Sequence, residues 1–560
     1  MRLPDGRRVA PLVRRAAKWE PWVVLGPLVV LQWIGVLVFT RYAEHNGWLF
    51  YHGGDQTWYF TTGWILGDGH IPDTFVGYGW SLLLAPLTWI AGPDFLAILP
   101  VVVLLQVVLV LPLGAWAAYA LGARAGGRIV GYGSAIVWTL APFATIPLFT
   151  ERYHDRWIDQ FLPEVFGLTG LGDLPATVAL LVAGVLVLRA IDDARWLDGA
   201  AAGVAAGFAI GIKPSNALFL AAPAVAFAIA RRPREAAGFA VALAPCLLTL
   251  ALWKYRGLGH VPLLAQQAGA YLAAGPLPVG ALPKSAQLDW DQLQENFRGL
   301  QEFSLNARLL QWLPIAGFVG LLHRAPAKAA FFATWLAAYL VVKGASPVTS
   351  VEAGSFWRLM MPAFPAYCVL MASIPLLWPR TGVRLPDRFP HVSRRVIPVV
   401  VPAAVFLLVP LAAVAAATPL RDDDHAAEIG LENLYVPINR DLDLRAERRG
   451  PSVYLRWKPA DERRTNVFYA VYRVRSGARI GKGSELFPIV RGIFCHREKE
   501  GASRCSLEMS RIATTRRTGF AEGPPSGRWV YRVGVLANWR DDPSLGDPVY
   551  VTDPVEVDVP

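Results

Sequence analysis

The sequence has few charged residues for its length. Asp, Glu, Lys and Arg together make up 17% of the 560 residues, whereas about 25% is usual in soluble domains. Hydrophobic residues make up 54%, and the mean hydropathy is +0.36. Many of them form apolar runs that approach the length needed to cross a bilayer. This composition excludes an ordinary soluble domain and predicts a polytopic α-helical membrane protein.

Eleven apolar segments, each ending at polar, Gly or Pro residues, are interpreted as transmembrane helices. The predicted spans are 21–40, 96–122, 129–147, 175–190, 197–212, 215–230, 236–254, 308–323, 328–345, 358–378 and 396–418.

Positive charge predicts the orientation of these spans, because cytoplasmic loops retain Lys and Arg during insertion. Basic residues collect in the N-terminal tail and in alternate loops, near Arg124, Arg189, Arg231, Lys328 and Arg394. With eleven spans, the N-terminus lies in the cytoplasm and the C-terminus lies outside. The first apolar segment lacks a signal-peptide cleavage site, so we expect a retained helix.

These inner loops also account for much of the net charge of +11, so we expect no nucleic-acid partner. The chain contains nine lysines among its 54 basic residues. This preference for arginine is typical of GC-rich bacterial genomes. We therefore place the protein, with several spans, in a bacterial plasma membrane, where it contacts membrane lipid.

Cysteine is also scarce, with four residues in the whole chain. Cys246 and Cys368 lie in apolar segments, whereas Cys495 and Cys505 lie ten residues apart in the polar C-terminal region. That region is predicted to lie outside the cytoplasm, so the second pair is expected to form a disulfide. A zinc site is not expected there, because only His496 accompanies the pair.

The composition changes beyond residue 420 and divides the chain into a membrane domain, 1–420, a polar linker, 421–450, and a C-terminal domain, 451–560. Short runs of alternating apolar and polar residues in the last part predict an extracytoplasmic antiparallel β-sandwich. The pattern resembles a fibronectin type III module, with Trp457 on an early strand and Tyr531 on a late one. Such a resemblance implies a fold and no activity.

Asp55 stands in the first long polar gap, residues 41–79, ahead of an aromatic-rich stretch. Trp58, Tyr59 and Trp64 are among the residues that predict a helix lying in the membrane interface, where such rings are stable. Asp55 would begin this helix at the outer face, where lipid-linked substrates present their polar head groups.

A purely structural role for Asp55 is also open, because Asp commonly caps helix N-termini. Position 58 is Trp rather than Glu or Gln, so no capping box supports this interpretation. The two roles are compatible, since a capping residue can also face a cavity.

A second outer loop carries Glu151, His154 and Asp155. Carboxylate and imidazole groups at this spacing are suited to binding a divalent cation or orienting an acceptor hydroxyl. They are equally typical of a solvated helix with internal ion pairs.

Two cations lie at outer ends of predicted spans, Lys213 at a Lys-Pro turn and Arg358 at the start of the tenth span. A boundary cation often only extends its charge toward water. Positive charge is not favoured topologically on the outer side, however, and a phosphate ligand would explain both residues.

Together these features resemble the GT-C superfamily of membrane glycosyltransferases, in particular the branch of protein mannosyltransferases and bacterial aminoarabinose transferases. The resemblance covers roughly residues 1–380. It rests on the cytoplasmic N-terminus, the acidic residue in the first long outer loop, and several short motifs. These motifs are Gly77–Leu83, Ala85–Leu87, Gly92-Pro93, Lys213-Pro214 and Arg358–Pro365.

The resemblance implies an inverting transfer of a sugar from polyprenyl phosphate to a hydroxyl group of a glycan, lipid or protein. It gives Asp55 the role of catalytic base, while Lys213 and Arg358 would bind the donor phosphate. Many members have a second acid where this chain has Gln56, which argues against a two-carboxylate mechanism or a metal site at that point. The Pro-Pro pair found in many members is replaced by Gly77-Tyr78-Gly79.

Other functions remain open. A lipid-linked glycan ligase or polymerase would use a similar substrate, although its large outer loop normally comes late in the chain. A secondary transporter would place charges at mid-membrane and usually show repeated halves. A noncatalytic scaffold would bind glycan through its outer domain.

Overall fold

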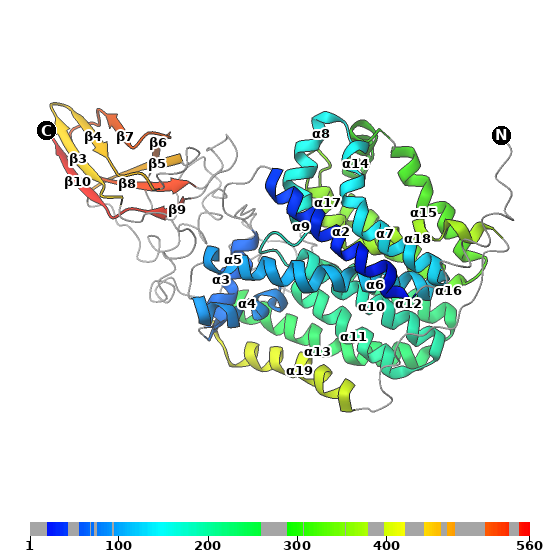
Figure 1. The fold of residues 1–560 in the computed structure, drawn as a ribbon. Helices are drawn as coiled ribbons and strands as arrows, with labels where there is room; N and C mark the ends of the chain where they lie inside the picture. Colours follow the sequence, from blue (N-terminus) through cyan, green and yellow to red (C-terminus); the bar gives the residue numbers. More distant parts are fainter. Residues whose placement is uncertain are drawn as a thin grey trace.

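The computed structural model describes thirteen stretches of the chain: 20–42, 55–67, 69–71, 76–91, 95–258, 288–305, 307–352, 354–378, 397–419, 442–460, 468–476, 510–536 and 548–560. Cys495 and Cys505 lie outside them, so their disulfide stays a prediction. Figure 1 shows a large helical region with a separate, smaller sheet region at one end.

The helical region contains eighteen α-helices among the described residues. They are α2 (Pro21–Tyr42), α3 (Asp55–Gly67), α4 (Tyr78–Ala91), α5 (Phe95–Leu105), α6 (Leu111–Gly126), α7 (Arg128–Ala144), α8 (Glu151–Arg156), α9 (Leu162–Val165), α10 (Asp173–Asp193), α11 (Trp196–Ile212), α12 (Ala221–Ala230), α13 (Pro233–Leu258), α14 (Trp290–Phe303), α15 (Ala307–Leu322), α16 (Pro326–Gly344), α17 (Ser355–Met360), α18 (Phe364–Ala372) and α19 (Ile397–Ala416).

Short π-helical or 3₁₀ segments connect several of them. These are η1 (Gln106–Val110), η2 (Ile146–Leu148), η3 (Trp157–Phe161), η4 (Pro214–Leu220), η7 (Met361–Ala363) and η8 (Ile374–Leu377).

Helices occupy all eleven ranges predicted as spans, but the count of eleven spans is not confirmed. Within the described residues, five helical stretches are long and apolar enough to cross a membrane: Pro21–Arg41, Ile98–Gly126, Asp173–Asp193, Pro233–Gly257 and Ser355–Leu377. Four more are apolar but shorter, namely Trp196–Ile212, Pro214–Ala230, Leu310–Leu322 and Ala404–Ala416. The length and composition of the other predicted spans do not establish that they cross, because about 20 apolar residues are needed to cross the hydrocarbon core.

The helix α3 begins at Asp55 as predicted, and one of its faces is buried. Tyr59, Phe60 and Ile65 are buried. A Cβ on Gly63 would lie 2.8 Å from the carbonyl oxygen of Ser81 in α4, so the two helices pack closely. This face therefore packs inside the protein, and the position of α3 at the membrane interface stays a prediction. The helix α4 was not predicted; it lies mostly between the end of the polar gap at residue 79 and the predicted span that begins at residue 96.

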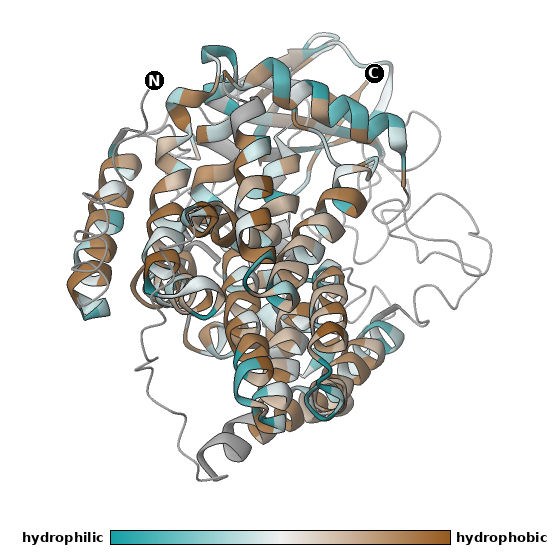
Figure 2. Ribbon diagram, turned by 90° about the vertical axis from the view of Figure 1, so that its right-hand side faces the viewer, coloured by the Kyte–Doolittle hydropathy of each residue, from teal (hydrophilic) through white to brown (hydrophobic). Residues whose placement is uncertain are grey.

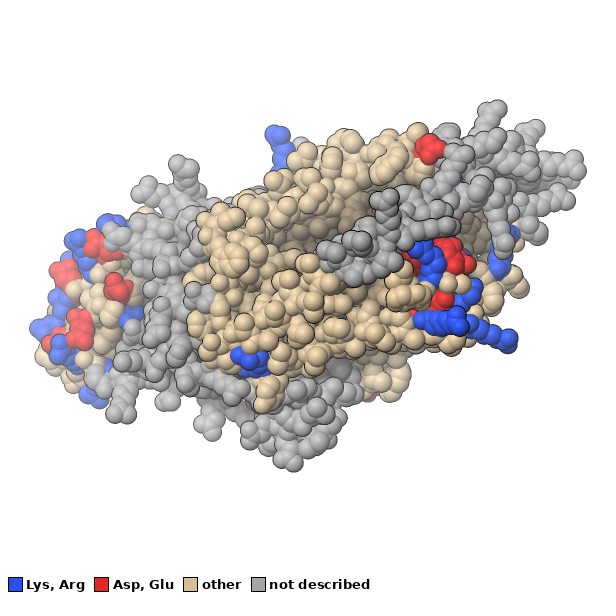
Figure 3. Space-filling model, turned by 90° about the horizontal axis from the view of Figure 1, so that it is seen from below, with Lys and Arg blue, Asp and Glu red and all other residues tan. Residues whose placement is uncertain are grey.

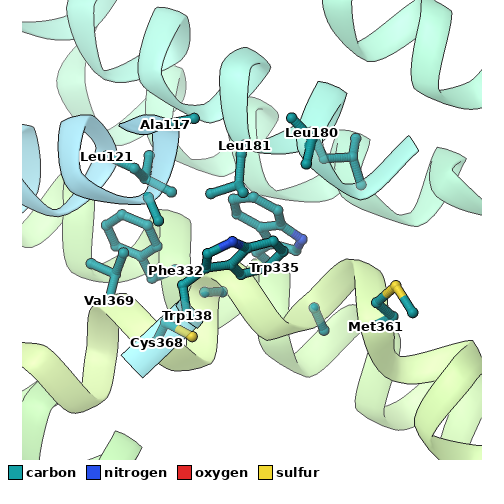
Figure 4. Packing of buried hydrophobic residues seen from close by; sticks show 14 of the residues in the cluster. Ala117, Leu121, Trp138, Leu180, Leu181, Phe332, Trp335, Met361, Cys368 and Val369 are labelled. Carbon is teal, nitrogen blue, oxygen red and sulfur yellow. The ribbon is translucent and has the colours of Figure 1, made fainter. Parts of the chain in front are cut away.

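The main core lies between α6, α7, α10, α16 and α18. Figure 4 shows the ring of Trp138 and those of Phe332 and Trp335 beside Leu121 of α6 and Leu181 of α10. The indole N–H of Trp335 donates to the carbonyl of Pro362 at 2.9 Å. Burying such large side chains removes much apolar surface from water or lipid and fixes the helices that carry the site.

Hydrophobic residues run along most helices in Figure 2. Seen from below in Figure 3, a broad surface with few charged side chains separates charged residues at the sheet end from those at the opposite end. A charge-poor face of this kind is what a bilayer requires of the surface that it contacts.

Two short strands connect the first polar gap to the end of α19. The strand β1 (His70–Ile71) pairs in parallel with β2 (Thr418–Pro419), and the backbone N–H of Thr418 donates to the carbonyl of Gly69 at 2.8 Å. The segment that follows α3 and the segment that leaves the helical region therefore lie on the same side of it.

The sheet region consists of two antiparallel sheets. One has the order β3 (Arg445–Arg449), β4 (Ser452–Arg456), β7 (Gly519–Glu522); the other has the path β10 (Val555–Val559), β8 (Gly527–Leu536), β5 (Phe468–Arg475), β6 (Ser510–Thr515), with β9 (Pro548–Val551) also paired to β8. Buried residues of both sheets, such as Val453 and Val533, belong to one hydrophobic cluster.

Three details differ from the sequence prediction. The first sheet begins at Arg445, inside the stretch assigned to the linker. The residues from 549 to 559 predict a single edge strand containing Pro554, but this range holds parts of two strands, β9 and β10. Pro554 directly precedes β10, where it removes no donor from a ladder. Trp457 directly follows β4, and its ring lies 5.5 Å from that of Tyr469.

Candidate functional site

The two predicted phosphate-binding cations meet on one buried carboxylate. Asp173, the first residue of α10, has a side chain with no exposed surface. The ammonium group of Lys213 contacts its Oδ1, and Nη2 of Arg358 lies 3.4 Å from its Oδ2. A charged carboxylate in such a place requires close cationic partners, because burial without them is very costly.

Glu164 and Lys343 extend this group of charges. Nε of Arg358 lies 3.5 Å from Oε1 of Glu164, so the guanidinium group bridges two carboxylates. Lys343, in the last turn of α16, is buried and close enough to Lys213 for the two ammonium groups to repel each other. We name Asp173, Lys213, Arg358 and Glu164 the charged cluster.

The Gly77-Tyr78-Gly79 motif holds the turn that carries Lys213. A Cβ on Gly77 would lie 2.1 Å from the carbonyl oxygen of Gly211, and one on Gly79 would lie 2.8 Å from the backbone nitrogen of Ile212. Neither position tolerates a side chain without displacing backbone. The glycines therefore let the start of α4 lie directly against the end of α11, where Lys213 follows.

The N-terminal end of α3 contacts two of the segments that supply the charged cluster. Oε1 of Gln56 accepts the backbone N–H of Gly170 at 2.9 Å, three residues before Asp173. The hydroxyl of Tyr59 donates to the carbonyl of Ile212 at 3.3 Å, one residue before Lys213. Asp55 begins this helix, so its backbone lies beside the residues that lead into the cluster. Its side chain is outside the described part of the structure.

Arg358 is held from the other side by an aromatic group. The indole N–H of Trp357 donates to the hydroxyl of Tyr153 at 2.8 Å, and that hydroxyl donates to the carbonyl of Val351 at 2.5 Å. Burial raises the pKa of Tyr153 above its ordinary value, so the phenol keeps its proton and both bonds. Asn296 of α14 accepts the N–H of Val351 and fixes the same loop.

The second outer loop does not form a visible metal site. Glu151 is exposed, and Nε2 of His154 contacts the carbonyl of Phe149 at 3.0 Å. The side chain of Asp155 lies outside the described residues. Among the residues that were searched, no three His, Cys, Asp or Glu side chains are arranged to hold a metal ion.

A different set of ion pairs occupies the opposite end of α10. Arg124 of α6 lies 3.4 Å from Asp193, and Nζ of Lys328 lies 2.8 Å from Asp192. Arg189 pairs with the buried Asp198 at 3.5 Å. The 21 residues of α10 span about 30 Å, the thickness of a hydrocarbon core. The basic loops and the charged cluster therefore lie at opposite ends of one helix that can cross a bilayer.

The sequence analysis missed Asp173, which joins the two cations. An acidic residue at the edge of an apolar run is typical of the start of a helix. No basic residue close to Asp173 in sequence suggested an ion pair. The available signal is the Gly-rich stretch 166–172 ahead of it, which lets the chain approach other segments closely. Gly167, with a φ of 67°, lies within that stretch.

Comparison with protein-family models, with characterised proteins and with solved structures finds no match to this chain. The interpretation of the site therefore rests on its residues and their geometry.

Proposed function

We propose that this chain is an integral-membrane glycosyltransferase of the GT-C type that uses a sugar linked to polyprenyl phosphate as donor. The observation that carries the proposal is the convergence of Lys213 and Arg358 on Asp173, beside the helix that Asp55 begins. Two cations held at the end of a possible span form a site suited to a lipid phosphate. Sugar transfer also needs a general base, and we assign this role to the carboxylate of Asp55.

The chemistry of sugar transfer explains this combination. Breaking the bond between sugar and phosphate develops positive charge on the anomeric carbon and negative charge on the leaving phosphate. Fixed cations lower the energy of the second charge. Asp55 takes the proton of the acceptor hydroxyl as general base while that oxygen attacks the anomeric carbon, so the configuration inverts.

Asp173 and Glu164 have a different role, since they hold the cations in place. Arg358 contacts one oxygen of each carboxylate, and the planar fork of a guanidinium is well suited to binding phosphate oxygens. Lys213 supplies a point charge. Pairing with acids also reduces the cost of keeping two cations in a partly buried site before the donor binds.

The finer topology belongs to the same proposal. We infer eleven spans, with the N-terminus in the cytoplasm, because short apolar helices inside a bundle need not match the full bilayer thickness. The C-terminal sheets then form an extracytoplasmic sandwich of the fibronectin type III kind on the side of the charged cluster. The parallel pairing of β1 with β2 supports this common side.

The experiment is transfer of a radiolabelled sugar from polyprenyl phosphate to extracted envelope glycans, lipids or proteins in proteoliposomes. We expect a glycosylated product that forms only when the protein is present. The anomeric configuration of the transferred sugar should be inverted relative to the donor. Donor should accumulate and one glycan linkage should disappear in a deletion strain, as measured by mass spectrometry. Movement of an intact substrate across the vesicle membrane without transfer would instead indicate a transporter.

A further inference from the structure

Gln56 is the second residue of α3, and its side chain is almost completely buried, with 1% of the residue exposed. The Oε1 atom accepts the N–H of Gly170, which sets the orientation of the amide because only the oxygen can accept. The Nε2 atom is buried and has no hydrogen-bond partner in the described part of the chain. A buried donor without an acceptor is unfavourable, and in native proteins it calls for an explanation.

Gln106 provides a comparison within the same structure. It is also 1% exposed, and it contacts the same Gly-rich stretch, where its Nε2 donates to the carbonyl of Thr169 at 2.7 Å. Two buried glutamines thus hold adjacent residues of one segment. The amide nitrogen of Gln106 has a protein acceptor, whereas that of Gln56 does not.

The unused donor lies in a turn that is suited to binding an anion. The first N–H groups of a helix lack partners within the helix and carry a partial positive charge. Gln56 and Tyr59 of this turn contact the residues that lead into Asp173 and Lys213. An oxygen with negative charge would satisfy the Nε2 donor at the end of α3 that contacts the segments leading into Asp173 and Lys213.

We propose that Nε2 of Gln56 donates a hydrogen bond to a phosphate oxygen of the polyprenyl-phosphate donor. Gln56 is then a phosphate-binding residue, and it links the helix of Asp55 to the leaving group. Its own oxygen is occupied by Gly170, so the amide serves as a donor and not as a metal ligand. This inference rests on the proposed function and specifies how one part of the donor is held.

The test compares two neutral substitutions in the full-length protein, Gln56→Met and Gln106→Met. Each removes one amide that holds the Gly-rich stretch, but only the first removes the unused donor. Binding of polyprenyl phosphate without sugar is measured in nanodiscs. We expect affinity to fall about tenfold or more in Gln56→Met, because hydrogen bonds to charged groups are strong, and to stay within threefold in Gln106→Met.

Gln56→Glu keeps the test decisive if the Met variant does not fold. A carboxylate still accepts the Gly170 N–H, so the Gly-rich stretch keeps this contact. Burying the new charge lowers thermal stability, and the lost donor together with that charge should abolish most binding by the folded variant. Affinity within twofold of the parent in the folded variant, or equal losses in the two Met variants, would overturn the inference. Failure of the parent itself to bind polyprenyl phosphate would instead reject the proposed function.

Discussion

Arg358 and Asp173, 185 residues apart in the chain, are joined by a contact of 3.4 Å between Nη2 and Oδ2. The carboxylate has no exposed surface, whereas 26% of the arginine side chain is exposed. Asp173 is therefore positioned to hold the guanidinium group of Arg358, and the exposed part of the Arg358 side chain can contact a ligand. Four predictions follow from this division of roles and from the topology.

Asp173→Asn should destabilise the helical region and weaken donor binding together. The substitution leaves two cations beside a neutral amide, and breaking a buried pair in this way costs about 3–5 kcal/mol. Thermal unfolding in detergent and polyprenyl-phosphate binding measure the two effects. Asp198→Asn is the control, because it breaks a buried pair with Arg189 at the opposite end of α10. It should lose stability and keep its affinity. Parent-like behaviour of Asp173→Asn would show that the pair is not formed.

Arg358→Lys should weaken donor binding although it keeps the charge. An ammonium group cannot contact both carboxylates and a phosphate in the way that the guanidinium fork does. We expect about a tenfold lower affinity, equivalent to roughly 1.4 kcal/mol. Arg152→Lys is the matched control, since Arg152 is exposed and pairs with Glu302 at 3.3 Å. Equal affinities of the two variants would remove Arg358 from the phosphate site.

The topology predicts that α14 and the sheet region are reached by reagents from outside the cell. Gln294→Cys and Gly523→Cys place thiols at exposed positions, and a Cβ on Gly523 meets no atom within 4 Å. A membrane-impermeant maleimide should label both in intact cells, after Cys495 and Cys505 are replaced by serine. Arg234→Cys, in an inner loop, should react only after permeabilisation. Labelling of Arg234→Cys in intact cells, with labelling of the other two variants only after permeabilisation, would show that the orientation is the opposite one. The charged cluster would then not lie at the outer face.

Local patterns predicted much of the helical region. The apolar runs fall on helices throughout, and α3 begins at Asp55. The sequence also singled out Lys213 and Arg358, because positive charge at an outer boundary needs a physical cause. The number of helices that cross a membrane could not be predicted from the apolar runs. It depends on the apolar length of each helix, and that length depends on where the helix begins and ends.

The partners of the cations could not be predicted, because the contacts join segments that are distant in sequence. Asp173 meets Lys213 and Arg358 only after α10, α11 and α17 have packed together. The glycines at positions 77 and 79 belong to a motif of the family resemblance, but their packing role is clear only from the close approach of Gly211 and Ile212. The pairing of β1 with β2 likewise joins two-residue strands, which are too short to show any alternation.

The central claim is that Asp55 is the catalytic base, and turnover of Asp55→Asn tests it most directly. Asn caps helices nearly as well as Asp, so the variant should fold and bind donor while its turnover falls about a hundredfold or more. Asp289→Asn gives the matched control, because Oδ1 of Asp289 caps α14 by accepting the N–H groups of Asp291 and Gln292 at 3.0 and 3.2 Å. Its turnover should stay within a few fold of the parent. Turnover of Asp55→Asn in that same range would contradict the account and leave Asp55 as a helix cap.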